Sequence, residues 1–371
     1  MKHRILLFLQ ILFLGALVAC QGQQPDNNDD TGTLSGNISL ITNHDIIRAN
    51  GSDTATLTVL LTDETGMIHD VSNDAEIYST TSDTPLETNQ FTTSQEGSHS
   101  FYALYGLAVS NTIDISAVGG LSDIPADPNA SSTDFTHRIM LLQHTGTECP
   151  NCPGLMNNLK RVAEDEAYAG RYYHVASHSY NDSDPAYSSS AANLSGSLGV
   201  RSYPWLTFNF FRANAYLGET ESIKECIDLF HEERAAVGIA ASTTIVDGKI
   251  YANVGVKAGK SGTYRLGMWV LEDNIHGTQS GANASWQHNH NNCLRGMGGA
   301  NKNEKLYGKN LGLIESGQSS SAIVAVELDK DWKVDNCKIF LFVASENNEG
   351  EIELINSTLC PAGEMVEYAY N

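Results

Sequence analysis

Two cysteines, Cys149 and Cys152, are the residues of this sequence whose type and spacing most directly indicate chemistry. A Cys-X-X-Cys pair serves as a redox couple that exchanges disulfides, as half of a zinc site, or as a structural bridge. The pair lies in the stretch HTGTECPNCPGLMNNL, which runs from His144 to Leu159. The choice between the three roles depends on the compartment of the protein and on the elements that hold the pair.

Zinc is the weakest of these interpretations. A closed zinc site needs four ligands, and the chain has no second Cys-X-X-Cys pair. His174 and His178 could share one strand face, and WQHNH, Trp286 to His290, contains two more histidines. The WQHNH stretch has no acidic or cysteine partner at ligand spacing, so we expect a polar loop there. We therefore predict neither a metal nor a cofactor.

The cysteine pair falls between a predicted strand and a predicted helix. HRIMLLQHTG contains a buried-strand run, CPNCPGLMNNLKRVAED is helical, and RYYHVASHSY is a strand. A loose helix, the strand WLTFNFF and the amphipathic helix SIKECIDLFHEERAA follow. Strands that alternate with helices indicate an α/β unit, which we assign to residues 137–236.

The expected position of the helix start gives the two cysteines different environments. A helix that begins at Cys149 has both prolines of CPNCP in its first turn, where their missing N–H groups cost nothing. Leu155, Leu159, Val162 and Ala163 then form the buried stripe, with Cys152 shielded at its root. We therefore expect Cys149 to be accessible at the positive end of the helix dipole, which favours the reactive thiolate.

The N-terminus indicates export. Residues 1–19 have a short basic head and an apolar run that is too short to span a bilayer, as in a secretory signal. The end of this run, Leu17 to Cys20, resembles the lipobox of bacterial lipoproteins, which implies cleavage before Cys20 and lipidation of that cysteine. Gln21 implies sorting to the outer membrane. An ordinary signal peptide with a chance cysteine is the alternative. Residues 20–35 are polar and predict a flexible tether.

The charge balance limits the partners. The 371 residues carry a formal net charge of −22, which argues against nucleic acid and suits a body outside the cytoplasm. The length exceeds that of a single core, so several domains are expected.

Two β-rich regions flank the α/β unit. Residues 36–121 combine alternating runs such as TATLTVLLTD with turn signals, and they resemble the immunoglobulin-like β-sandwich domains of bacterial surface proteins. Residues 122–136 form a linker rich in Pro, Ser and Asp. Residues 237–371 return to strands and predict a C-terminal β-sandwich. The predicted fold class is therefore mixed and multidomain.

The central unit resembles the thioredoxin superfamily. A Cys-X-X-Cys pair between strand and helix is followed by GVRSYPWL, which is similar to the loop of that family in which a cis-proline packs against the disulfide. Pro204 is the matching residue, so the resemblance implies a cis Tyr203–Pro204 bond. Two residues depart from the pattern. Glu148 replaces the usual tryptophan, and Gln143 replaces the buried acid that carries protons.

The order of lipobox, sandwich, thioredoxin-like unit and sandwich resembles the outer-membrane-protein-28-related lipoprotein family. The most specific marks are HTGTECPNCPG, the Tyr203–Pro204 loop and WQHNHNNCLRG, although Cys293 stands where the family usually has an aliphatic residue. The resemblance concerns location more than activity.

Two functions follow from these features. In the first, Cys149 attacks a substrate disulfide, Cys152 resolves the mixed disulfide, and Pro204 shapes the peptide groove. The partners would then be extracytoplasmic protein thiols or disulfides. In the second, the protein is a surface binding or adhesion lipoprotein with an unknown ligand, and Cys149–Cys152 is a stable bridge. In both, Cys20 anchors the chain to the membrane.

A second disulfide is expected near the C-terminus. Cys337 opens the strand CKIFLFVAS, Cys360 closes IELINSTLC, and ENNEGE lies between them as a turn. A hairpin that is symmetric about Asn348 and Glu349 places the two cysteines opposite each other, within bridging distance. We therefore predict a structural Cys337–Cys360 disulfide, with Cys293 unpaired. Three unlinked thiols, or Cys293 in place of one partner, are the alternatives.

Overall fold

The computed structural model describes residues 35–210 and 219–371. The predicted signal peptide, the predicted lipidation site Cys20 and nearly all of the predicted tether lie outside these ranges. Within them, none of the helices combines the length and the apolar character needed to cross a bilayer. Most of the described secondary structure is β-strand, arranged in several sheets.

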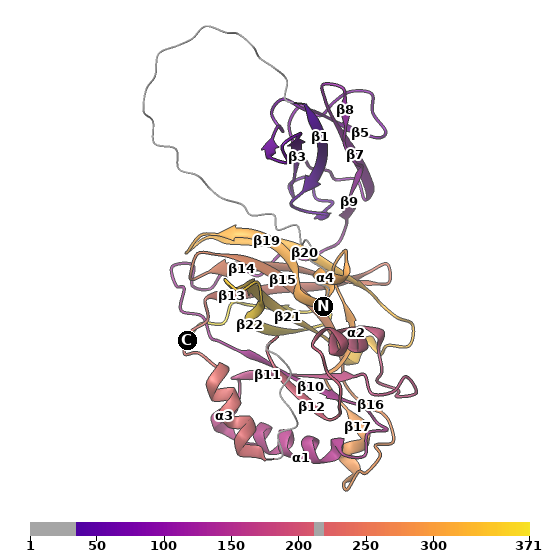
Figure 1. Ribbon diagram of the computed structural model, residues 1–371, viewed down its shortest axis with the longest axis vertical. Helices are drawn as coiled ribbons and strands as arrows, with labels where there is room; N and C mark the ends of the chain where they lie inside the picture. The colour runs from indigo at the N-terminus through magenta and orange to yellow at the C-terminus, as the bar shows by residue number, and fades with distance from the viewer. Residues whose placement is uncertain (1–34, 211–218) are drawn as a thin grey trace, which may run out of the picture.

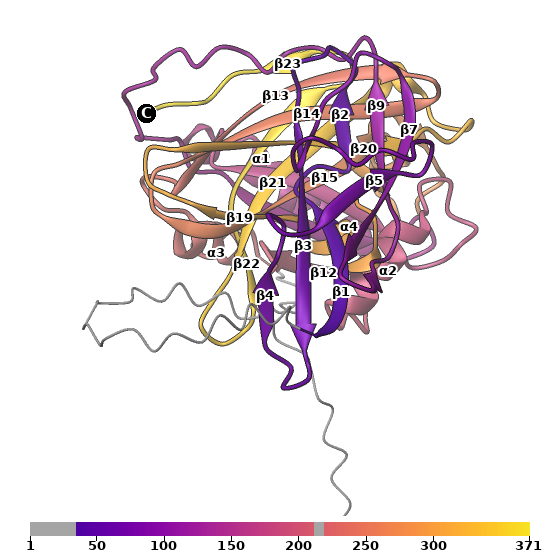
Figure 2. The same ribbon diagram turned by 90° about the horizontal axis from the view of Figure 1, so that it is seen from above.

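The N-terminal region is a sandwich of two sheets around one core. Along β3 (Ala55–Asp63) every second side chain from Ala55 to Leu61 is buried, as the alternating sequence predicts. Phe101 and Ile115 of the other sheet pack against them. Figure 1 shows this sandwich at one end of the molecule, and Figure 2 looks onto it from that end. One sheet contains β1 (Gly36–Thr42), β3, β4 (Ile68–Asp70) and β6 (Gln90–Phe91); the other contains β2 (Ile46–Arg48), β9 (Ile113–Val118), β7 (Gly97–Tyr105), β5 (Glu76–Ser79) and β8 (Ala108–Val109).

The central region alternates strands and helices as expected. Strand β10 pairs in parallel with β11 and antiparallel with β12. Helices α1 and α3 pack on one face of these strands through a shared core, and α2 packs on the other face (Figure 1). The elements are β10 (Ile139–Thr145), α1 (Cys152–Ala163), a 3-10 turn (Glu166–Tyr168), β11 (Tyr172–His178), α2 (Ser189–Ser197), β12 (Trp205–Phe208) and α3 (Thr220–Phe230).

The C-terminal region extends the sheet of the central region. Its order is β12-β10-β11-β18-β15-β21-β22, with β19 also paired to β15. The junction is a parallel contact between Ala176 of β11 and Cys293 of β18. A second sheet, β20-β14-β13-β23, covers this part of the first sheet across an apolar core. The elements are β13 (Val237–Val246), β14 (Lys249–Ala258), β15 (Gly262–Glu272), β18 (Cys293–Met297), α4 (Lys302–Tyr307), β19 (Lys309–Ile314), β20 (Ser319–Glu327), a 3-10 turn (Val334–Asn336), β21 (Cys337–Glu346), β22 (Ile352–Pro361) and β23 (Met365–Val366).

The predicted linker, residues 122–136, packs on the second sheet. Lys257 of β14 donates a hydrogen bond from Nζ to Asp127 at 2.8 Å. Phe135 is fully buried and bridges to Ala235 and Tyr370. This segment therefore attaches the N-terminal sandwich to the C-terminal region through side-chain contacts as well as through the chain.

The predicted Cys337–Cys360 bridge is wrong, because both cysteines are free thiols in the structure. Cys360 lies opposite Ile339, two residues beyond the expected partner. The register differs from a symmetric hairpin by one residue at the turn, and a bulge between Val343 and Ala344 adds a second residue. Both thiols are buried, and burial raises the pKa of Cys337 to about 12 and that of Cys360 to about 11. Cys293 is unpaired, as predicted.

Candidate functional site

Cys149 and Cys152 form a disulfide where the chain passes from β10 into α1. The helix begins at Cys152, with Asn151 as its N-cap residue. This corrects the expected start at Cys149 by three residues, so Cys149 belongs to the turn before the helix. Pro153 occupies the second helical position, where its missing N–H costs no hydrogen bond. Leu155, Leu159 and Val162 form the buried stripe as predicted, whereas Ala163 is exposed.

Both cysteines are buried, which corrects the expectation of an accessible Cys149. The exposed fraction is 1% for Cys149 and 0% for Cys152. The prediction was wrong because a distant segment, residues 277–288, packs over residues 146–152, the turn that contains both cysteines. We call these two segments the cover and the disulfide turn. The cover follows β16 (Ile275–His276), ends in a 3-10 turn (Ser285–His288), and leads into β17 (Asn289–His290). In Figure 1, β16 and β17 lie beside the N-terminal end of α1.

Gln279 is the main polar contact between this cover and the disulfide turn. Its side-chain Nε2 lies 3.2, 3.1 and 3.0 Å from the carbonyl oxygens of Gly146, Thr147 and Cys149. The N–H of Ser280 donates to the Thr147 oxygen at 2.6 Å. The Gly146 and Cys149 oxygens also accept hydrogen bonds within the turn, from the N–H groups of Cys149 and Cys152, so the segment adds further partners to this irregular turn.

The far end of the cover is attached to α1. Gln287 is fully buried, and its Nε2 donates to the Pro153 carbonyl at 3.1 Å. Gly281 approaches the turn so closely that a Cβ atom there would lie 2.3 Å from the Pro150 oxygen. Its φ of +70° is also a conformation that favours glycine. The 277–288 segment is thus fitted to the turn by backbone contact as well as by side chains.

A buried histidine–carboxylate pair fixes the other side of the turn. Nδ1 of His178 and Oδ2 of Asp184 are 2.8 Å apart, and the N–H of Thr147 donates to the same oxygen at 2.7 Å. Burial raises the pKa of the Asp184 carboxyl, but the hydrogen bond from His178 and those from backbone N–H groups outweigh it and hold the pKa at about 2. Asp184 is therefore ionised at neutral pH and acts as a backbone anchor.

The polar side chains of Gln143, His144 and Glu148, close to the cysteines in sequence, bond to groups other than the disulfide. His144 bonds to Ser195 of α2 at 2.8 Å and to Thr207 at 3.3 Å, and burial lowers its pKa to about 3. Gln143 accepts a hydrogen bond through Oε1 from His174 at 3.0 Å. Glu148 is exposed and accepts hydrogen bonds from Ser183 and Asn181.

The predicted cis bond is present at Pro204. The Tyr203–Pro204 bond is cis, and Pro204 is buried directly before β12. Because Trp205 lies opposite His144 of β10, Pro204 is at the same end of the sheet as the disulfide turn. The Tyr203 hydroxyl donates to the Ser179 carbonyl at 3.2 Å and holds the loop against the end of β11.

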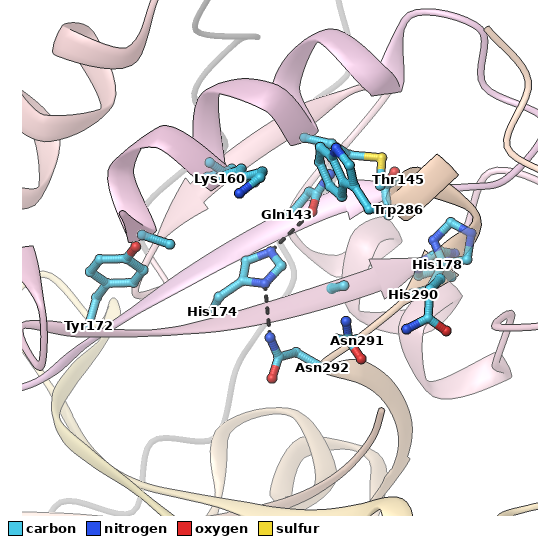
Figure 3. A pocket seen from close by; sticks show the side chains of 15 residues that line it. Gln143, Thr145, Lys160, Tyr172, His174, His178, Trp286, His290, Asn291 and Asn292 are labelled. Atoms are coloured by element: carbon cyan, nitrogen blue, oxygen red, sulfur yellow. Dashed lines mark hydrogen bonds between the residues drawn. The ribbon is translucent and has the colours of Figure 1, made fainter. Parts of the chain in front are cut away.

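A cavity of about 480 Å³ adjoins the site between α1, the β10–β11 strands and the end of the cover. Figure 3 shows the side chains that line it, with His174 hydrogen-bonded to Gln143 and Asn292. Trp286 also lines the cavity. Much of the WQHNHNN stretch noted in the sequence lines this cavity. Its histidines do not gather as metal ligands, because His288 and His290 bond to the backbone of Gln279 and Gly277. Within residues 35–210 and 219–371 no cluster of three or more His, Cys, Asp or Glu side chains is arranged for a metal.

Sequence reasoning missed three residues of this site. Gln279 carries no local signal, because only the fold brings it to a turn 130 residues away. Asp184 follows the strand that ends at His178, and the spacing of six residues between the two was a usable hint. Thr145, two residues after Gln143 on β10, faces the same cavity and was foreseeable from strand alternation.

Comparison with known proteins adds a likeness of fold. No family model matches the chain, and no curated protein matches it. Among solved structures, HBP35 of Porphyromonas gingivalis is similar, with a TM-score of 0.52 and 18% identity over 62% of this chain and 77% of that one. At this identity the likeness concerns the fold alone. Domains 4–9 of the surface layer protein SbsC cover 89% of this chain and 51% of that chain, at 10% identity and a TM-score of 0.18, which supports no argument.

Proposed function

We propose that this chain is a lipoprotein of the outer membrane, anchored through Cys20, that uses a thioredoxin-like unit as a scaffold for binding. In this function the Cys149–Cys152 disulfide is a structural bridge. The observation that carries the proposal is the burial of both cysteines, at 1% and 0% exposure, beneath residues 277–288.

Several features support the thioredoxin-like part. Strand β10 leads through the disulfide turn into α1, pairs in parallel with β11 and antiparallel with β12, and is followed by a cis-proline loop. Helices α1 and α3 share one face of these strands. This arrangement and the motifs HTGTECPNCPG and WQHNHNNCLRG support the proposal that the chain is related to the outer-membrane-protein-28-related lipoproteins.

The cover is the reason for preferring binding over thiol exchange. A thiolate that attacks a disulfide must reach one sulfur directly, so the rate depends on access. Here Gln279, Ser280 and Gly281 lie against the turn that contains Cys149. No proton carrier occupies position 143, where Gln143 instead bonds to His174. Thiol–disulfide exchange would require the 277–288 segment to leave the turn in every cycle.

The reduction potential of the pair tests this choice. Structural disulfides lie below about −300 mV, whereas catalytic pairs lie above that value. Equilibration of the purified protein in dithiothreitol buffers of graded potential, followed by alkylation and mass spectrometry of the 149–152 peptide, measures it. A potential above this boundary would replace the binding function with the redox function.

Membrane attachment is tested separately. Cys20→Ser removes the residue to be lipidated, so the variant is expected in the soluble fraction after cell lysis, whereas the wild type sediments with membranes. The matched control is Cys226→Ser, because Cys226 is a free, half-buried thiol on α3. Unchanged sedimentation of Cys20→Ser would refute the anchor and leave the question of binding open.

A further inference from the structure

Two buried polar groups at the cavity beside the disulfide turn have no hydrogen-bond partner. They are Nε2 of Gln143 and Oγ1 of Thr145, on the face of β10 that is turned toward α1. Each residue is only 3% exposed. Unpaired buried donors are rare in folded proteins because they lose their bonds to water and gain nothing in return. Both residues line the 480 Å³ cavity, so a group bound there would supply the missing partner.

The part of the cavity wall formed by α1 and Trp286 is mainly apolar and adaptable, whereas histidines and asparagines line the side toward β11 and β17. Met156 and Leu159 face it from α1, and Trp286 closes one side with 37% of its surface exposed. Neighbouring side chains seal both unpaired atoms from solvent. Met156 has a flexible unbranched side chain, and Trp286 is at the surface, so these two can turn aside for a ligand. An aromatic ring held between them would replace the apolar contacts that they give up.

The charges around the cavity favour a ligand whose polar group is electron-rich. None of the described residues that line it is an acid, although the chain as a whole has a net charge of −22. Lys160 is the one lining residue with a permanent charge; it pairs with Glu164 and lies 6.0 Å from the Trp286 ring. Burial lowers the pKa of His174 and of His290 to about 4, so both are neutral at pH 7.

We propose that this cavity binds a small aromatic molecule through a carboxylate or carboxamide oxygen that accepts hydrogen bonds from Gln143 Nε2 and Thr145 Oγ1. The ring lies between Trp286 and the apolar side chains of α1. This proposal rests on the binding function proposed above and gives it a ligand class. The WQHNHNN stretch, which metal binding does not explain, has a role here as the outer wall of the site.

Three indoles of similar size test the need for an acceptor: indole-3-acetamide, indole-3-acetate and 3-ethylindole. Ligand-observed NMR titration of the full mature chain is expected to show that the first two bind at least about tenfold more tightly than 3-ethylindole. The reason is that a buried donor left without a hydrogen-bond partner lowers the affinity about tenfold. Equal affinity for all three, or binding of none, would overturn the proposal. Equal affinity for acid and amide identifies the shared oxygen as the determinant, and a Lys160→Gln effect on the acid alone would add a charge contribution.

A matched pair of variants assigns the binding to this cavity. Thr145→Val removes the unpaired hydroxyl at constant shape and is expected to weaken indole-3-acetamide about tenfold while leaving 3-ethylindole unchanged. Thr207→Val is the control, because Thr207 is equally buried but bonds to His144 away from the cavity. Its affinity for both probes is expected to equal that of the wild type. If Thr145→Val binds the acetamide as well as the wild type does, the assignment is wrong. The reduction potential of Cys149–Cys152 is measured independently, so failure here leaves the structural role of the disulfide intact.

Discussion

Replacement of Gln279 by alanine should expose the disulfide to reductant. The two N–H groups of its amide serve the carbonyls of the disulfide turn, at 3.0 to 3.2 Å. Each such bond contributes about 1 kcal/mol net, so the substitution removes about 2 kcal/mol from the closed arrangement. Oε1 of Gln279 is buried without a partner, and its removal returns part of this loss. The net cost is therefore about 1–2 kcal/mol.

The substitution destabilises only the closed state, in which residues 277–288 lie on the disulfide turn. The Gly146, Thr147 and Cys149 oxygens each keep a backbone donor, from Cys149, Ser280 and Cys152 respectively, so the turn itself stays satisfied. The open population should then rise about five- to thirtyfold, since about 1.4 kcal/mol corresponds to a factor of ten. Because reduction proceeds through the open state, its rate should rise by the same factor.

The assay is the rate at which dithiothreitol reduces Cys149–Cys152 in the folded protein, followed by alkylation at timed intervals. Gln318→Ala is the matched control, because Gln318 is exposed and distant from the turn in sequence. The control should react at the wild-type rate. Equal rates for Gln279→Ala and the wild type would refute the view that residues 277–288 limit access to the disulfide.

Three further predictions concern stability and thiol content. Thr145→Val should raise the free energy of unfolding in urea by about 1–3 kcal/mol, because it deletes a buried unpaired hydroxyl; a loss of stability would indicate a partner for that group. Stability should fall as the pH drops from 7 to 5, because the unfolded chain protonates His144 near its ordinary pKa of about 6.5 whereas burial lowers the folded pKa to about 3. The expected contribution of His144 is about 2 kcal/mol, and urea titrations of His144→Gln should show a correspondingly smaller pH dependence; an unchanged dependence would exclude His144 as its source. A thiol titration of unreduced, denatured protein that lacks residues 1–20 should detect four free thiols, namely Cys226, Cys293, Cys337 and Cys360. A count of two would mean that a second disulfide is present.

The order of elements around the site was predictable from local pattern. Buried runs and helical stripes placed β10, α1, β11 and β12 within a few residues of their observed bounds, whereas α3 ends at Phe230, six residues before its predicted end at Ala236. The cis Tyr203–Pro204 bond was predicted from the resemblance of its loop to thioredoxins and is present. Cysteines three residues apart at a strand–helix turn are close in any compact conformation, so their pairing needs no distant part of the chain.

The C-terminal hairpin shows where local pattern failed. A symmetric turn predicted that Cys337 faces Cys360, but a one-residue offset at the turn and the bulge at Val343 and Ala344 together shift the partner to Ile339. A bulge inserts one residue on one strand without changing the hydrophobic alternation on either side enough to reveal itself in the sequence. Register past the bulge depends on packing of the two sheets around their common core.

The sequence by itself determined three local features: the Cys149–Cys152 bridge, the alternating burial along strands of the N-terminal sandwich, and the apolar stripe of α1. These features follow from side-chain periodicity and from short separation along the chain, and both can be recognised in a short stretch of sequence. Only the tertiary structure decided that Cys149 is buried and that polar atoms of Gln143 and Thr145 lack hydrogen-bond partners. Those outcomes depend on residues 277–288, which reach the disulfide turn from 130 residues away. Burial is a property of everything that packs on a side chain, and periodicity along one strand or helix contains no information about a covering segment so distant in the chain.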